Sequence, residues 1–303
     1  MTAPIALFAY KRTDALQRTV AALQANHLAT DSELHVFVDG PKHPNDRLKV
    51  EAVRDVARAL RAPTGGFRAV HLHFSEQNQG CAQSIINGVS AVLRTHDSVI
   101  VVEDDVVTAP NFLDFVNQGL SAYAHNPKVF SVGGYTFPFA KPANYPHDVY
   151  FYGRTCAWGW GIWADRWAKT DWSVADYPQF MADADQRRAF NYYGSDRVRM
   201  LRRNMQGEID TWDIRLCYAL FKQQGLTVLP TLSKTSNIGF GGNDGTHGNV
   251  YNRYQTTLDS GEQRWFAMPE QVAENAYYTE QVRHQFSLPV RLYNRIKTMA
   301  GIR

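Results

Sequence analysis

Three adjacent carboxylates, Glu103, Asp104 and Asp105, follow directly on a run of β-forming residues, Val99–Val102. Like charges packed this closely repel one another, and burying even one of them is costly unless it is paired. A hard divalent cation offsets that cost, because Mn²⁺ and Mg²⁺ prefer carboxylate oxygens as ligands. The stretch therefore predicts a Mn²⁺ or Mg²⁺ site at a strand end. The alternative is that the acids lie in solvent or cap the next helix.

Polar side chains also follow the other apolar runs of the first hundred residues: Tyr10 and Arg12 after Pro4–Ala9, Asp39 after Leu34–Val38, and Asn78 after Ala69–Phe74. Each run is short and either apolar or alternating, as in a β-strand, and the segments between them carry apolar residues at helical spacing. Strands that alternate with helices predict an α/β fold with a mostly parallel sheet. Ligands bind at the carboxyl ends of such strands, so we expect a ligand site where these polar side chains converge.

Two acids three residues apart, Asp210 and Asp213, lie in a predicted helix that begins at Asp210 and ends at Gly225. One interpretation is structural: Asp210 caps the helix, and Asp213 lies in its first turn, where the helix dipole favours a negative charge. The other interpretation is catalytic. Either carboxylate is of the right type for a general base, which accepts a proton from an attacking hydroxyl group.

Five tryptophans crowd the segment from Tyr152 to Trp172: Trp158, Trp160, Trp163, Trp167 and Trp172. Indole rings bury a large apolar area, which favours a core cluster. The glycines between them, Gly159 and Gly161, favour instead a loop whose backbone approaches a ligand. Apolar ring faces flanked by hydrogen-bonding groups also suit sugar rings, so both a core role and a substrate-lining role stay open.

A glycine-rich stretch, Ser236–Asn249, carries a single imidazole at His247. It lacks the lysine and hydroxyl ending of a phosphate-binding P-loop. A lone histidine is usually no ligand, but next to an acidic cluster it completes a metal site or contacts a phosphate in some proteins.

The composition excludes several classes of protein. With 303 residues, 44% of them hydrophobic, the chain can bury a sizeable core in one large domain or two fused halves. A formal net charge of +3 is too weak for a nucleic-acid footprint. The three widely spaced cysteines argue against a disulfide framework. Because neither a signal peptide nor a membrane-spanning apolar run is evident, we expect a cytoplasmic protein.

The last segment, Gln281–Arg303, has an amphipathic pattern after Pro289. Apolar residues alternate with basic ones at near-helical spacing: Val290, Leu292, Tyr293, Ile296 and Met299 with Arg291, Arg295 and Lys297. Either the apolar side of this helix packs on the rest of the protein, or the helix makes a salt-sensitive, peripheral contact with an anionic membrane.

Seven stretches, in this order, resemble segments of GT-A-type glycosyltransferases: "ALFAYKRTDALQRTVAALQAN", "FVDGPK", "NQGCAQSIINGV", "VVEDDV", "WGWGIWADRW", "DTWDIRL" and "SNIGFGGNDGTHG". The "VVEDDV" stretch resembles the Glu-Asp-Asp version of the DXD metal motif. That version occurs in the N-acetylglucosaminyltransferase I family and in bacterial polysaccharide glycosyltransferases related to family 2. The resemblance covers roughly residues 3 to 250.

This resemblance implies a GT-A fold, with a Rossmann-like, mostly parallel central sheet flanked by helices. Residues 1–250 would form the catalytic domain, of which 1–106 bind the nucleotide sugar and 107–250 bind the acceptor. Residues 251–303 would form a C-terminal extension with a helical tail.

The resemblance also implies roles for single residues. Asp105 would bind the metal, and His247 would approach the metal or the diphosphate. Glu103 and Asp104 would lie beside them, and Asp39 would contact the nucleobase. Further contacts with the nucleotide sugar are expected from a set of polar and aromatic residues: Tyr10, Arg12, Asn78, Ser84 and Trp160. Alignment on an acid-tryptophan-arginine pattern favours Asp210 as the base, a small shift favours Asp213, and Glu208 is a third candidate.

The implied function is a metal-dependent, inverting transfer of a sugar from a nucleoside diphosphate donor, expected to be a UDP-sugar. The acceptor would be a hydroxyl group of a glycan or of a lipid-linked saccharide. Two alternatives stay open. A sugar-1-phosphate nucleotidyltransferase uses a similar sheet but needs a glycine-rich loop that "LFAYKRTDAL" lacks. A non-catalytic carbohydrate-binding protein suits the tryptophans but does not need the acidic strand end.

Overall fold

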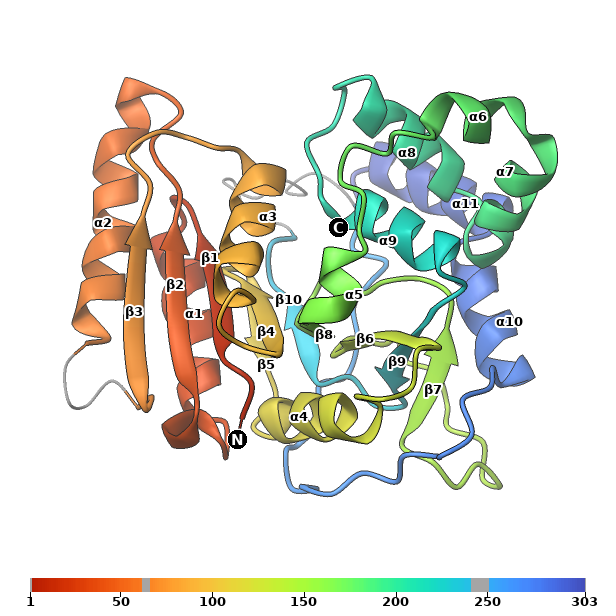
Figure 1. The fold of residues 1–303 in the computed structure, drawn as a ribbon, viewed down its shortest axis with the longest axis horizontal. Helices are drawn as coiled ribbons and strands as arrows, with labels where there is room; N and C mark the ends of the chain where they lie inside the picture. The colour runs from red at the N-terminus through yellow and green to blue at the C-terminus, as the bar shows by residue number, and fades with distance from the viewer. Residues whose placement is uncertain (1, 62–65, 241–250, 303) are drawn as a thin grey trace.

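The computed structural model describes residues 2–61, 66–240 and 251–302 (Figure 1). Its centre is an eight-stranded sheet in the order β3-β2-β1-β4-β8-β6-β9-β7, and a two-stranded sheet pairs β10 with β5. The strands are β1 Ile5–Ala9, β2 Glu33–Val38, β3 Ala69–Phe74, β4 Ser98–Glu103, β5 Val106–Thr108, β6 Val129–Gly133, β7 Val149–Tyr152, β8 Trp160–Trp163, β9 Leu226–Pro230 and β10 Thr235–Asn237.

The sheet is mixed but mostly parallel. Strands β3, β2, β1 and β4 pair in parallel with one another, and β6 and β9 run in the same direction. Only β8 and β7 run against their neighbours in the described sheet. This confirms the predicted α/β class, and the four strands predicted in the first hundred residues are β1 to β4.

The helices cover both faces of the sheet. They are α1 Thr13–Gln24, α2 Arg47–Ala59, α3 Cys81–Val92, α4 Phe112–Ala122, α5 Ala164–Ala168, α6 Tyr177–Ala182, α7 Ala184–Phe190, α8 Arg197–Met205, α9 Asp213–Lys222, α10 Ala276–Gln285 and α11 Leu288–Met299. Three short 3₁₀ turns are η1 Ala29–Asp31, η2 Pro44–Asp46 and η3 Asn191–Tyr193.

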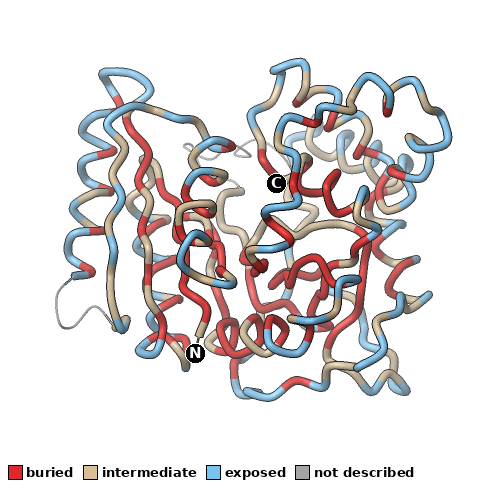
Figure 2. The backbone as a smooth tube through the Cα atoms, viewed as in Figure 1, coloured by how far each residue is buried: buried red, intermediate tan, exposed pale blue. Residues whose placement is uncertain are grey.

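Strand β4 explains why the core has two halves. Its residues are buried on both faces, as a parallel strand between two helical layers requires. Ile100 and Val102 pack with residues of α1, α2 and α4, whereas Val99 and Val101 pack with residues of α3 and α9. The buried trace accordingly runs through the middle of the molecule, with exposed residues on the outer helices (Figure 2).

Helix α9 begins three residues later than the sequence predicts. The side-chain amide of Asn204, on α8, donates to the backbone carbonyls of Ile209 and Thr211, at 3.1 and 2.9 Å. These bonds hold the segment around Asp210 as a loop, so Asp210 is not the helix cap and Asp213 is the first helical residue.

The two C-terminal helices pack differently from one another. Helix α10 buries Tyr278 and Val282, and Phe286 directly after it is buried too, in a cluster with residues of β7 and of the segment after β6. Helix α11 is the amphipathic helix predicted after Pro289, although it begins at Leu288 with the proline in its first turn, and none of its residues is buried. Its apolar side chains face outward: Leu288, Leu292, Tyr293, Ile296 and Met299 are all more than half exposed. The apolar side of α11 therefore does not pack on the rest of the described chain.

Candidate active site

An open cavity of about 1270 Å³ lies at the carboxyl ends of β1, β2 and β4. Many of the predicted site residues line it: Tyr10, Arg12, Asp39, Asn78, Ser84, Glu103, Asp104, Asp105, Asp210 and Asp213. Strands β2, β1 and β4 are neighbours in the sheet, so the residues that follow them meet at one edge.

The carboxylates of Asp104 and Asp105 are both paired with the guanidinium group of Arg12. Arg12 Nη1 lies 2.8 Å from Asp105 Oδ2, and Arg12 Nη2 donates to Asp104 Oδ1. The pairing follows from the sheet, because β1 and β4 run in parallel and end side by side. Asp105 is also held from β10, where Asn237 Nδ2 lies 3.2 Å from its Oδ1. One cation of the chain thus partly neutralises the acidic strand end.

Glu103 does not take part in that ion pair. Burial raises the pKa of Glu103 well above its usual range, and the charges of Asp105 and Asp104 raise it further. Burial also raises the pKa of Asp104 to about 6, although Arg12 opposes that shift. Three carboxylates around one guanidinium group leave excess negative charge, which a divalent cation with oxygen ligands relieves. The donor set therefore fits the predicted metal.

The carboxylate of Asp39 organises the loop that precedes α3. Its Oδ1 accepts hydrogen bonds from the backbone N–H groups of Gly40 and Gln79, at 2.8 and 2.9 Å. Its Oδ2 accepts from the Asn78 side chain at 2.9 Å and from Gly80 N at 3.1 Å. These donors engage both oxygens, so Asp39 holds the loop against the end of β2. Its contact with a nucleobase stays a prediction.

Tyr10 is anchored at the same edge by its hydroxyl group. The hydroxyl donates to Asp46 Oδ2 at 2.9 Å and accepts from the backbone N–H of Lys42 at 2.9 Å. Lys11 Nζ also pairs with Asp46, at 2.9 Å. Lys42 and Asp46, the two partners of the Tyr10 hydroxyl, both lie in the connection between β2 and α2. The Tyr10 ring is therefore held in place beside the cavity.

Asp210 and Asp213 approach from another wall of the cavity. Asp210 lies so close to Gly80 that a Cβ there would meet Asp210 Oδ2 at 2.6 Å, and Gly80 has a φ of +80°. The positive φ favours glycine at position 80, and a Cβ there would displace the Asp210 carboxylate. Asp213 accepts a hydrogen bond from Thr211 Oγ1, and its charge contributes to the raised pKa of Glu103. Both candidate bases therefore border the cavity, and one oxygen of Asp213 is already engaged.

Cys81 marks the point where these acids converge. It opens α3 and lines the cavity. Burial raises the pKa of its thiol, and the carboxylates of Glu103, Asp210 and Asp213 raise it further. Acids from β4 and from the start of α9 thus surround one residue of α3. The sequence carried no signal for this position, because a single cysteine has no motif.

Two predicted site residues lie elsewhere. Glu208 is exposed and pairs with Arg203 at 2.9 Å, and it does not line the cavity. Trp160 is only 1% exposed and stacks on Trp212, with ring centroids 4.9 Å apart, in the core under α9. Its expected contact with the nucleotide sugar is therefore wrong, because β8 begins at Trp160 and directs this side chain into the sheet's core face.

Trp158 takes the place beside the cavity that Trp160 was expected to have. It lies in the loop before β8 and meets Tyr135 and Tyr254 edge to face, at 4.8 and 4.9 Å between centroids. Only the register of β8 distinguishes Trp158 from Trp160, and that register is not visible in the tryptophan spacing. His247 lies outside the described residues.

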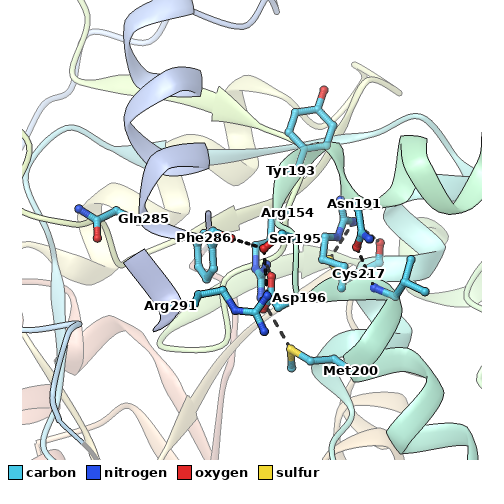
Figure 3. A network of polar contacts seen from close by, with 12 residues as sticks. Arg154, Asn191, Tyr193, Ser195, Asp196, Met200, Cys217, Gln285, Phe286 and Arg291 are labelled. Atoms are coloured by element: carbon cyan, nitrogen blue, oxygen red, sulfur yellow. Dashed lines mark hydrogen bonds and ion pairs between the residues drawn. The ribbon is translucent and has the colours of Figure 1, made fainter. Parts of the chain in front are cut away.

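A polar network closes the far side of the cavity (Figure 3). Arg154 forms two hydrogen bonds with Asp196, both 2.9 Å long, and its guanidinium group stacks on Phe286 with 4.0 Å to the ring centroid. Ser195 Oγ donates to the backbone carbonyl of Phe286 at 2.7 Å and accepts from Arg291 Nη1 at 2.9 Å. These contacts tie α10 and α11 to the start of α8. They also place the polar side of α11 toward the cavity.

The sheet is mostly parallel, and acidic side chains at one strand end face further carboxylates across an open cavity. These features define an enzyme of the nucleotide-binding α/β class. Residues 4–201 match the family described as Glycosyltransferase like family 2. That is more than half of the chain, so the chain belongs to this family and is a glycosyltransferase. The nucleotidyltransferase and the non-catalytic binding protein are set aside. A comparison with curated proteins found no match.

Solved structures of glycosyltransferases show distant likenesses. S. aureus TarS is 11% identical with a TM-score of 0.34, and the match covers 51% of this chain and 25% of that chain. TarS 1–349 in complex with UDP has the same identity and TM-score, covering 49% of this chain and 39% of that one. The galactosyltransferase LgtC in complex with donor and acceptor sugar analogues is 11% identical with a TM-score of 0.36, covering 72% and 70%. The chain thus spans about a quarter to two fifths of the matched TarS chains.

Proposed function

We propose that the protein is a metal-dependent, inverting glycosyltransferase that takes a sugar from a nucleoside diphosphate donor, expected to be a UDP-sugar. The observation that carries this proposal is the convergence on one cavity of the acids after β4 with Asp210 and Asp213 from another wall. A donor held between these two groups has its leaving diphosphate near the first and its anomeric carbon toward the second.

The donor side is assigned to the ends of β1, β2 and β4. The loop held by Asp39 and the anchored ring of Tyr10 would border the base and ribose. Arg12 is the cation nearest to the acids, and a diphosphate would draw it partly away from Asp105. Asp105, with Glu103 and Asp104 beside it, would hold the divalent ion. When bound there, such an ion supplies charge neutralisation for the leaving diphosphate.

We assign the general base to Asp210. It is exposed to the cavity, whereas Asp213 has one oxygen engaged by Thr211 and lies in the first turn of α9. Asp210 would accept the proton of the acceptor hydroxyl as that oxygen attacks from the side opposite the leaving group. Such an attack inverts the anomeric configuration.

The acceptor side is assigned to the aromatic wall around Trp158. Several rings border this part of the cavity: Tyr135, Phe137, Trp158, Phe240 and Tyr254. Aromatic faces and edges with hydroxyl groups nearby bind the apolar faces of sugar rings and orient their hydroxyl groups. A glycan or lipid-linked saccharide fits this wall, and the reacting hydroxyl would point toward Asp210.

We also propose that the outward side of α11 rests on an anionic membrane surface. Leu292, Ile296 and Met299 expose a stripe at helical spacing, at 58%, 56% and 80% exposure. Between Gln281 and Arg303 the sequence holds five Lys and Arg residues and no Asp or Glu, so no negative charge of this segment opposes an anionic bilayer. Because Arg291 and Arg295 line the cavity, the exposed apolar stripe carries this proposal. Each helix in the described ranges is too short or too polar to span a bilayer, so any contact would be peripheral.

Release of nucleoside diphosphate tests the enzymatic proposal directly. The purified chain is incubated with a panel of nucleotide sugars, Mn²⁺ and candidate saccharide acceptors, and both the released nucleotide and the glycosylated product are measured. We expect UDP release that requires the metal and rises with the correct acceptor. Turnover that is unchanged after the metal is removed by a chelator would contradict the metal-dependent mechanism.

A further inference from the structure

A second group of potential metal ligands lies at the other end of the sheet. Glu33 opens β2, His35 follows two residues later, His71 pairs with His35 across β3, and His96 lies just before β4. The described residues that line the cavity include none of these four. Asp39 follows Glu33 by six positions along β2 and its end, which amounts to about 20 Å at 3.3 Å per residue.

The imidazole nitrogens of this group converge on one carboxylate oxygen. Glu33 Oε2 lies 3.6 Å from His71 Nε2, 3.7 Å from His96 Nε2 and 3.9 Å from His35 Nε2. The ligand atoms of Glu33, His35 and His71 all lie within 4.8 Å of one another. Neighbouring ligand atoms around a tetrahedral zinc ion are about 3.4 Å apart. Side-chain shifts of about one ångström or less would therefore close Glu33, His35 and His71 around an ion, and His96 Nε2 lies 3.7 Å from the same Glu33 oxygen.

Hydrogen bonds to other atoms of Glu33 and His96 orient these side chains and leave the converging atoms free to bind an ion. Arg68 Nη2 binds the other oxygen of Glu33, at 2.8 Å. His96 Nδ1 lies 3.1 Å from the Val92 carbonyl and 3.0 Å from Thr95 Oγ1. The carbonyl can only accept, so it favours the tautomer with the proton on Nδ1 and a lone pair on Nε2. Metal-binding histidines are oriented by such outer hydrogen bonds.

His35 gives the most specific indication. Its Nδ1 lies 3.2 Å from His73 Nε2, while its Nε2 is buried and has no hydrogen-bond partner within the described part of the chain. A buried polar atom without a partner needs an explanation. Stacking of His35 on His71, with centroids 4.4 Å apart, accounts for the packing of the rings but not for this nitrogen.

We propose that Glu33, His35 and His71 bind a zinc-type ion, with His96 as the fourth ligand. Imidazole nitrogens with a single carboxylate suit Zn²⁺ or Co²⁺ better than Mg²⁺, which prefers an all-oxygen shell. Four protein ligands form a closed, structural site. The ion would join the edge strand β3 to β2 and to the α3–β4 connection, remote from the reacting groups.

Metal titration of the chelator-treated full chain tests this site. Zn²⁺ is titrated by calorimetry, and Co²⁺ by its visible absorption, which is intense for a tetrahedral ion with nitrogen ligands. The titrations use the Asp105→Asn variant as background, so that the acidic strand end does not contribute. We expect one ion per chain, a tetrahedral cobalt spectrum, and protection of the fold against heat by Zn²⁺.

Three variants sharpen the result. His71→Ala changes a half-exposed side chain and should lower the Zn²⁺ affinity more than 10-fold. Glu33→Gln keeps the shape of Glu33 and should do the same. His73→Phe removes only the outer partner of His35 and should cost about 10-fold. His125→Ala, an exposed histidine elsewhere, is the matched control and should bind as the background does.

Zinc affinity that is equal in His71→Ala, Glu33→Gln and the control would overturn the proposal, as would a weak, octahedral cobalt spectrum. Glycosyl transfer by His71→Ala at ordinary temperature should equal that of the wild type. Loss of transfer in that variant while it stays folded would contradict a structural role remote from catalysis.

Discussion

Arg12 and the three acids after β4 show how single residues set the charge of the site. The guanidinium group compensates Asp104 and Asp105 but not Glu103, whose pKa is raised by burial and by its neighbours. A site built in this way is electrostatically incomplete, because its acids outnumber its cation. A ligand that brings both positive and negative charge, such as a metal with a diphosphate, would complete it.

Replacing Asp105 should uncouple nucleotide binding from the metal. In Asp105→Asn, Arg12 keeps its pair with Asp104, so we expect the chain to fold. Calorimetric titration with UDP should then give the same weak affinity with and without Mn²⁺, whereas the wild type binds more tightly with the metal. Asp97→Asn, an exposed acid before the same strand, is the control. An unchanged metal dependence in Asp105→Asn would exclude Asp105 as a ligand.

Replacing the base should lower turnover and leave donor binding intact. We expect Asp210→Asn to reduce kcat by 10²- to 10⁴-fold with little change in the affinity for the nucleotide, because a base acts in the transition state. Glu208→Gln, two residues earlier and outside the cavity, should keep full activity. Stopped-time product assays and nucleotide titrations separate the two effects. If Asp213→Asn loses turnover and Asp210→Asn does not, the base is Asp213.

At the scale of elements, the ion pair of Arg154 and Asp196 joins the segment after β7 to the start of α8, beneath the C-terminal helices. Burial by itself would raise the pKa of Asp196, but the charge and hydrogen bonds of Arg154 outweigh it and lower this pKa to about 2. The folded-state pKa is thus below the unfolded value of 3.8. The pair therefore stabilises the fold above about pH 4, and this contribution is lost as the pH falls from 4 toward 2.

Denaturation as a function of pH tests this contribution. Asp196→Asn leaves Arg154 buried without its partner, so we expect it to be destabilised by about 3 kcal/mol at pH 7. The difference from the wild type should shrink by about 2 kcal/mol between pH 4 and pH 2. Asp185→Asn changes an acid that is 87% exposed and should show no such dependence. A difference that stays constant over this range would refute the assignment.

Helix α11 presents its polar side to the cavity and its apolar side outward, the reverse of an ordinary surface helix. We expect Leu292→Glu combined with Ile296→Glu to leave the fold stable, since both side chains are exposed, and to abolish sedimentation with anionic vesicles at low salt. Leu48→Glu is a matched control, because Leu48 is 86% exposed on the distant helix α2. Equal sedimentation of both variants would mean that α11 is not the membrane contact.

At the scale of the whole molecule, the cavity joins two regions of the chain. One wall comes from the ends of β1, β2 and β4, to which we assign the donor; the opposite wall comes from the loop before β8, the start of α9 and the C-terminal helices, to which we assign the acceptor. A ligand that contacts both sides therefore stabilises the complete fold rather than one element. We expect UDP with Mn²⁺ at 100 times its Kd to add about 2.7 kcal/mol to the free energy of unfolding.

Thermal unfolding measures that gain. UDP without the metal, and ADP with it, serve as comparisons, and the Asp105→Asn variant should lose the metal-dependent part. Stabilisation by Mn²⁺ alone that equals the effect of Mn²⁺ with UDP would contradict a shared donor and metal site.

The sequence by itself determined the first four strands and the edge at which their polar ends meet. Apolar runs and helical spacing report local burial, and in a parallel sheet the strand ends fall at one edge whatever the rest of the chain does. The presence of the amphipathic helix α11 was likewise local, since the apolar spacing after Pro289 predicts it.

Only the tertiary structure decided the choices between similar residues. The register of β8 placed Trp158 at the cavity and Trp160 in the core, and the bonds from Asn204 kept Asp210 out of α9. The sequence also does not show three further features: the pairing of Arg12 with the acids, the outward side of α11, and the approach of His71 and His96 to Glu33. Each depends on contacts between residues far apart in the chain, and no local spacing encodes which of these segments will meet.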